Sequence, residues 1–192
     1  DDGLRPEAAE AARADATRLS PHRMARTAEE LLLGLMENQD LTAPEAIERC
    51  AGDGAAWTAE LTARGSIVRM RVGGEERLVP AEERARFEAL ASGTLSREER
   101  DRLVLGYVGT RGPATAAEVA ARYGLAEDDV LDSLERLRLA ALVVAGRLGG
   151  EPGARRFAGA RLAEASRRRT LGIVRGEIRP VPQAVRRAFV AR

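Results

Sequence analysis

The stretch YVGTRGPATAAEVAARYGLAEDDVLDSLERLRLAALVVAGRLGG, residues 107–150, decides the fold. The segment TAAE at 115–118 places a hydroxyl three residues before a glutamate, which is typical of a helix start. Apolar side chains within 130–137 recur at steps of four and three residues, so they share one face of a further helix. The apolar run at 142–144 then predicts a β-hairpin whose tip is the glycine-rich segment 149–153. Short amphipathic helices followed by a hairpin are the pattern of a winged helix-turn-helix.

A weaker copy of the same pattern lies upstream. Capping boxes at 27–30 and 42–45 open two helices, and the alternating run SIVRMRV at 66–72 turns at Gly73-Gly74 before a second apolar run. We therefore predict a mainly α fold with small β-hairpin wings, arranged as a tandem winged helix-turn-helix. The predicted divisions are a linker or leader at 1–25, a first winged helix at 26–92, a second at 93–158, and an arginine-rich helix with the truncated start of a following module at 159–192.

Composition argues against several kinds of chemistry. All 31 basic residues are arginine, so the chain lacks the phosphate-binding lysine of a P-loop NTPase. His22 is the only histidine and Cys50 the only cysteine, which argues against a Ser-His-Asp triad and against a metal site. We expect no catalytic residue, no metal and no cofactor in this chain. No stretch approaches the roughly 20 apolar residues of a membrane span, and no signal peptide is evident, so we expect a cytoplasmic protein.

Charge is unevenly distributed along the chain. Residues 151–192 hold 11 arginines and three glutamates, a net charge of +8, whereas residues 1–150 hold 20 arginines and 27 acids, a net charge of −7. A strongly basic end on a nearly neutral protein favours an anionic partner near that end.

Arginines of the wings and of the C-terminal helix are therefore the candidate DNA contacts. The predicted recognition helix of the second unit carries five acids within 127–135, and these would repel phosphate. A single tryptophan is a candidate for stacking on a base, although a core position is the commoner role for such a residue. The predicted DNA-binding residues are Trp57, Arg69, Arg71, Arg77, Arg147, Arg155, Arg156, Arg167, Arg168 and Arg169.

Three strings resemble the C-terminal winged-helix modules of the large helicase-related (Lhr) family. They are RMRVGGEERLVPAEERARF at 69–87, GPATAAEVAARYGL at 112–125 and ARLAEASRRRTLGIVRGEIRPV at 160–181. The resemblance implies a parent protein that is a superfamily 2 DNA helicase, ATP-dependent with 3′–5′ polarity, using ATP and Mg²⁺ and acting in DNA repair. It also implies two partners. One is the pair of motor domains of the same parent chain, and the other is DNA, either single-stranded or duplex with a single-stranded tail. The motor motifs are missing here, so what carries over is an accessory role in gripping or guiding DNA.

Alternatives remain open at this point. A related DNA-glycosylase family shares the winged-helix layout but uses a Gln-x-Gln motif, and the glutamines here are Gln39 and Gln183, far apart. Tandem winged helices with acidic third helices also serve as protein-interaction scaffolds, as in ScpB-like proteins. A winged-helix transcription regulator is the weakest alternative, because neither predicted recognition helix offers side chains suited to reading bases.

Overall fold

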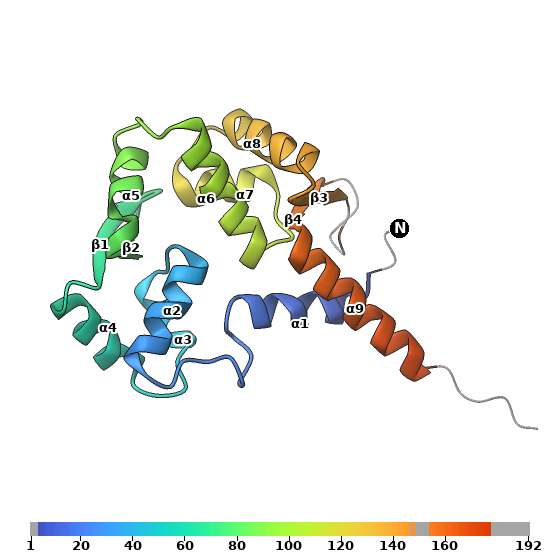
Figure 1. Ribbon diagram of the computed structural model, residues 1–192, viewed down its shortest axis with the longest axis horizontal. Helices are drawn as coiled ribbons and strands as arrows, with labels where there is room; N and C mark the ends of the chain where they lie inside the picture. The colour runs from blue at the N-terminus through green and yellow to red at the C-terminus, as the bar shows by residue number, and fades with distance from the viewer. Residues whose placement is uncertain (1–3, 147, 149–153, 178–192) are drawn as a thin grey trace, which may run out of the picture.

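Two helical units, each closed by an antiparallel hairpin, make up most of the molecule. The computed structural model describes residues 4–146, 148 and 154–177 (Figure 1). The first unit comprises α2 (Ala28–Asn38), α3 (Ala43–Glu48), α4 (Gly54–Ala63), β1 (Ile67–Val72) and β2 (Glu75–Pro80). The second comprises α6 (Arg97–Thr110), α7 (Ala116–Tyr123), α8 (Glu127–Leu139), β3 (Val143–Gly146) and β4 (Arg156–Gly159). The units are joined by the 3₁₀ turn η1 (Ala81–Glu83) and by α5 (Arg84–Ala91).

Both units have the same topology. A single-residue bridge follows the first helix of each and adds to the second strand of its hairpin, Leu41 to Leu78 in the first unit and Ala114 to Phe157 in the second. The order helix, bridge, helix, helix, hairpin is that of a winged helix. The predicted fold class, mainly α with small hairpin wings in tandem, is therefore confirmed.

Local sequence explains where the helices begin. Complete capping boxes form at Thr42, Ser96 and Thr115, where each hydroxyl accepts a hydrogen bond from the third helical amide and the glutamate at that position accepts one in return. Gly124 ends α7 in the left-handed conformation that glycine adopts most readily. These signals are local, which is why the sequence predicts the helix starts well.

The N-terminal residues correct one prediction. Residues 1–25 were expected to form a linker or leader, but Pro6–Ala16 form helix α1, which packs against α9 (Ala160–Glu177) (Figure 1). Ala8 and Ala12, one helical turn apart, are buried in this contact. Alanines make a stripe that is too small and too weakly apolar to stand out in the sequence, yet they let two helices approach closely.

The first hairpin belongs to both units. Its strands pair with Val68 opposite Val79 and Met70 opposite Arg77, so one face carries these side chains and Val72. Val72 and Val79 are buried in the core of the second unit, with Val68 and Met70 packed against it. The opposite face places Ile67 and Leu78 in the core of the first unit, so the hairpin lies between the two cores.

The tip of this hairpin is docked on the second unit. A Cβ atom added to Gly73 would lie 2.2 Å from the carbonyl oxygen of Arg122, at the end of α7. A Cβ atom added to Gly124 would lie 3.4 Å from the Cα atom of Gly73. The tip of the first wing is therefore packed against the second unit, and its glycine turn is not free to contact a ligand.

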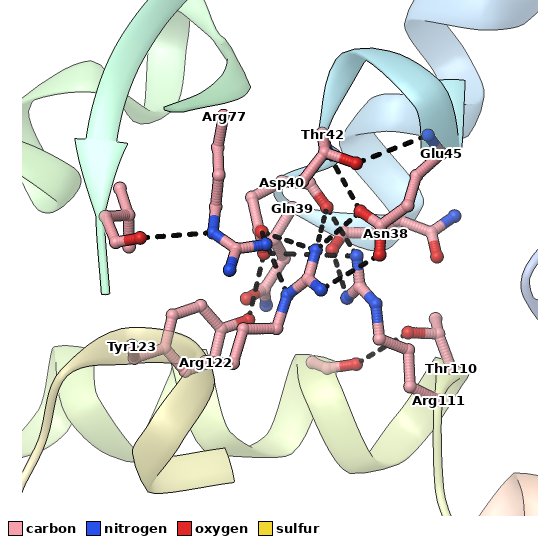
Figure 2. Close-up of polar contacts among 12 residues, drawn as sticks. Asn38, Gln39, Asp40, Thr42, Glu45, Arg77, Thr110, Arg111, Arg122 and Tyr123 are labelled. Atoms are coloured by element: carbon pink, nitrogen blue, oxygen red, sulfur yellow. Dashed lines mark hydrogen bonds and ion pairs between the residues drawn. The ribbon is translucent and has the colours of Figure 1, made fainter. Parts of the chain in front are cut away.

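A buried ionic cluster completes the junction of the two units (Figure 2). Asp40, which follows α2, is fully buried, and its carboxylate accepts hydrogen bonds from Arg77 at 3.3 Å, from Arg122 at 2.8 and 3.0 Å, and from the Tyr123 hydroxyl at 3.1 Å. Arg111 donates to the main-chain carbonyls of Asn38 and Asp40. Burial, followed by the charge of Asp40, raises the pKa of Tyr123, so its hydroxyl stays a donor.

Glu45 joins the same cluster through Arg122. The two side chains form a bidentate pair at 2.9 and 3.0 Å. Burial alone would raise the pKa of Glu45, but the hydrogen bonds and the charge of Arg122 outweigh burial and lower it to about 2. Glu45 therefore favours the folded state only while it is ionised.

Replacing Asp40 tests the cluster. We expect Asp40→Asn to lower the free energy of unfolding by about 3 kcal/mol or more, because three guanidinium groups lose their shared buried counter-charge. Urea unfolding measures this. Glu76→Gln is the control, since its pair with Arg69 is exposed and should cost less than about 1 kcal/mol. Equal effects of the two substitutions would contradict the structural role of Asp40.

Two neighbouring glycines test the docking of the wing. Gly73 and Gly74 both have positive φ, so alanine strains the backbone at either position, by about 1 kcal/mol. Only Gly73→Ala also drives a methyl group into the second unit, and we expect it to cost about 2 kcal/mol more than Gly74→Ala. The midpoints of urea unfolding compare the two, and a free wing would give similar values.

The pKa of Glu45 predicts a pH dependence. Because this pKa is lowered from 4.5 to about 2, the stabilisation from Glu45 is complete above about pH 5 and is lost as the pH falls towards 2. We expect the difference in unfolding free energy between the wild type and Glu45→Gln to shrink across this window, by at most about 1.4 kcal/mol per pH unit. A difference that stays constant from pH 7 to pH 2 would exclude this linkage.

Candidate nucleic-acid interface

The arginines predicted on the first wing lie in different environments. Arg77 is 3% exposed and is held by Asp40 and Glu75, so it is not accessible to a phosphate and its predicted DNA contact is corrected. Arg69 is exposed and paired with Glu76 at 2.6 Å. Arg71 is also exposed, and it makes no ion pair with any residue that the structure describes. The difference follows from the two-residue period of a strand, because Arg77 points to the second core while Arg69 and Arg71 point away from it.

Of the three arginines predicted as DNA contacts on the second wing, the structure describes two. Arg147 lies outside the described residues. Arg155 stacks its guanidinium 5.0 Å from the centre of the Phe157 ring and pairs with Glu135 of α8. Arg156 is half-buried and donates to the carbonyl of Pro113 at 3.0 Å. Both described arginines are thus used within the fold, and a DNA contact by either remains a prediction.

Trp57 lies on α4 and is half-buried. It packs against the first core, and a Cβ atom added to Gly52 would touch its indole ring at 2.8 Å. The structure therefore gives this side chain a packing role, and stacking on a base remains a prediction.

Helix α9 points the three consecutive arginines at 167–169 in different directions. Consecutive helical residues point about 100° apart, so Arg167, Arg168 and Arg169 cannot form one contact surface. Arg169 turns towards α1 and pairs with Asp15. Arg168 is exposed and has only a distant partner in Glu164, at 3.8 Å. Arg167 is exposed on the flank of the helix and has no ion pair within the described part of the chain.

A row of arginines follows the outward side of α9 instead. We call Arg161, Arg168 and Arg175 the α9 row, and all three are exposed. They are spaced by seven residues, or nearly two full turns, so they lie in line on the side opposite the buried residues Leu162, Ser166 and Thr170. Arg161 and Arg175 were not among the predicted contacts. Both lie seven residues from Arg168, so the helical period would have identified them from the sequence.

The recognition helix of the second unit presents the opposite charge. Glu127, Asp128 and Asp132 on α8 are exposed, together with Leu131. Asp129 pairs with Arg100 at 3.1 Å. In Figure 1, the second hairpin, β3 and β4, lies between α8 and the start of α9.

No constellation for catalysis or metal binding occurs among the residues described. No three His, Cys, Asp or Glu side chains in that part of the chain are grouped to hold a metal ion. Cys50 is buried, its thiol donates to the carbonyl of Ala46, and burial raises its pKa, which disfavours the reactive thiolate. His22 lies at the surface, 3.4 Å from Asp15. No described helix has the length and hydropathy needed to cross a membrane.

Two solved structures show a distant likeness to this chain. The DIP2311 protein of Corynebacterium diphtheriae is 14% identical with a TM-score of 0.36, and the match covers 69% of this chain but 26% of that one. ScpB of Mycobacterium tuberculosis is 23% identical with a TM-score of 0.28, covering 72% of this chain and 94% of that one. Such low TM-scores carry no argument about function. No curated protein matches the chain.

The comparison with protein families is informative. Residues 2–93 match the family model described as the winged-helix domain of large helicase-related protein. The match takes in α1, the first winged unit and α5. The match therefore supports a winged-helix module of the large helicase-related (Lhr) type in residues 2–93 of this chain.

Proposed function

We propose that this chain is an accessory nucleic-acid-binding module of an Lhr-like, ATP-dependent DNA helicase. It grips or guides DNA by its phosphates and performs no chemistry itself. The observation that carries the proposal is the α9 row, three exposed guanidinium groups in line on one helix.

The geometry of the row suits a phosphate backbone. With a rise of 1.5 Å per residue, arginines seven apart are separated by about 10.5 Å, and the row spans about 21 Å. Arginine stays charged at any physiological pH and binds phosphate through its planar fork of donors. Two of the three, Arg161 and Arg175, have no ion pair within the described residues, and Arg168 has a weak one. Their charge is therefore directed to the solvent and is not used within the fold.

The parent protein supplies what this module lacks. From the match of residues 2–93 to the Lhr winged-helix domain, we infer that motor domains of the same parent chain, in the cytoplasm, bind ATP and Mg²⁺. We propose that these domains drive strand separation with 3′–5′ polarity, as a superfamily 2 helicase in DNA repair does. The substrate is single-stranded DNA or duplex DNA with a single-stranded tail. Arg71 on the first hairpin is a second candidate for a backbone contact.

One observation favours a different function. The exposed acids and Leu131 of α8 would suit a basic protein partner, as in a protein-interaction scaffold. A sequence-reading regulator is less supported, because α4 exposes Ala55, Ala56 and Ala59, which offer no hydrogen bonds to base edges.

A salt series tests the proposal. For single-stranded DNA, each phosphate contact contributes about −0.7 to the slope of log K against log salt, and for duplex DNA about −0.9. We expect the triple variant Arg161→Ala, Arg168→Ala, Arg175→Ala to bind more weakly and to flatten the slope by about 2 to 3. Fluorescence anisotropy with labelled single-stranded and duplex oligonucleotides measures both quantities.

The matched control removes three arginines elsewhere. Arg13, Arg64 and Arg138 are exposed and paired with Glu10, Glu60 and Glu135, respectively. Their triple replacement by alanine changes the net charge equally and should leave the slope nearly unchanged. Equal losses in both triple variants would indicate a general charge effect, and no binding by the wild type at low salt would exclude autonomous DNA binding.

A further inference from the structure

A hollow lies at the N-terminal end of the α9 row, where α1, α6 and α9 meet. Its volume is about 400 Å³. Three arginines line it: Arg23, which precedes α2, and Arg161 and Arg169 of α9. Asp15 of α1 is the acidic residue of the lining, and the remaining wall is made of small and apolar residues. Arg161 thus belongs both to the hollow and to the α9 row.

The charges in the hollow are not balanced. Asp15 is already occupied, because it pairs with Arg169, accepts a hydrogen bond from Ser20 and lies 3.4 Å from His22. Arg23 reaches Glu37 only at 3.5 Å, and that glutamate is held more closely, at 2.7 Å, by the buried Arg18. Arg161 has no ion pair in the described chain. Three guanidinium groups therefore meet one engaged carboxylate, which leaves a positive hollow.

The lining also suits a small tetrahedral anion. Gly109 of α6 forms part of the wall, and a Cβ atom added there would meet nothing within 4 Å, so space opens directly above its backbone. The first turn of α9 contributes Arg161 and Leu162 to the lining, which brings the positive end of an 18-residue helix to the hollow. Arginines converging from two directions can bind several oxygens of one phosphate at once.

We propose that this hollow holds one phosphate group of the nucleic-acid strand that follows the α9 row. The inference rests on the proposed function. It adds one phosphate-binding site, which we call the seat, to the contacts made by the α9 row. The shared chemistry is a phosphate, supplied either by a phosphodiester within the strand or by a phosphate at one of its ends.

Filling the hollow tests the seat without removing charge. Gly109→Leu places a side chain into open space in a helix, where leucine is favoured over glycine, so the fold should persist. Arg23→Ala removes a charge from the hollow but none from the row. We expect each variant to weaken binding of a single-stranded oligonucleotide of about 16 nucleotides by about ten-fold or more, the effect of losing a charge-assisted contact. Ala59→Leu places the same side chain on exposed α4 and should leave binding unchanged.

Oligonucleotides with a 5′ phosphate, with a 3′ phosphate or with neither separate the two sources. Weakening with all three indicates an internal phosphodiester, and weakening with only one phosphorylated form indicates that strand end. Thermal unfolding confirms that the variants fold, and Arg23→Ala supplies the test if Gly109→Leu does not.

The experiments distinguish a failure of the phosphate site in the hollow from a failure of the proposed function. If the triple row variant weakens binding while Gly109→Leu and Arg23→Ala do not, the seat is excluded and the proposed function stands. If the wild type binds no oligonucleotide at low salt, both are overturned.

Discussion

The carboxylate of Asp40 determines how the rest of the molecule is arranged. It comes from the first unit, while Arg77 comes from the shared hairpin and Arg122 and Tyr123 come from the second unit. A buried charge is tolerated only with close counter-charges and satisfied hydrogen bonds, so these elements cannot separate without a large penalty. The cluster therefore fixes the geometry of the tandem, and it takes an arginine of the first wing into the interior.

This arrangement changes where a nucleic acid can bind. In a winged helix, the recognition helix and the wing are the usual contacts. Here α8 is acidic, α4 exposes alanines, and the first wing is docked by its glycine tip. The row of exposed arginines Arg161, Arg168 and Arg175 lies on α9, which packs against α1 through Ala8, Ala12 and the pair between Asp15 and Arg169. In the proposed function, the contact surface for nucleic acid is therefore the helix that follows the winged units.

The sequence predicted what depends on local chemistry. Capping boxes and glycine turns act within a few residues, so the sequence alone predicts the helix starts and the first hairpin. The environment of Arg77 was not, because it depends on Asp40, 37 residues earlier in the chain, and on which face of the hairpin meets the second unit. Of the predicted arginine run at 167–169, Arg168 lies in the exposed α9 row. Arg167 and Arg169 point in other directions, because side chains on one face of a helix are spaced by about 3.6 residues and are not consecutive in the sequence. Helix α1 was missed because alanine stripes resemble linker composition.

The family match ends at residue 93, but the physical unit does not. Val72, Val79 and Phe87 precede that limit, yet they are buried in the core of the second unit with Val104 and Leu134. A chain cut at residue 93 would expose these side chains to water and would leave Asp40 without Arg111 and Arg122. The tandem is therefore the smallest part in which the first hairpin is satisfied on both faces. Since α1 also needs α9 as its packing partner, the α9 row belongs to the same folded unit as the winged helix that matches the Lhr domain.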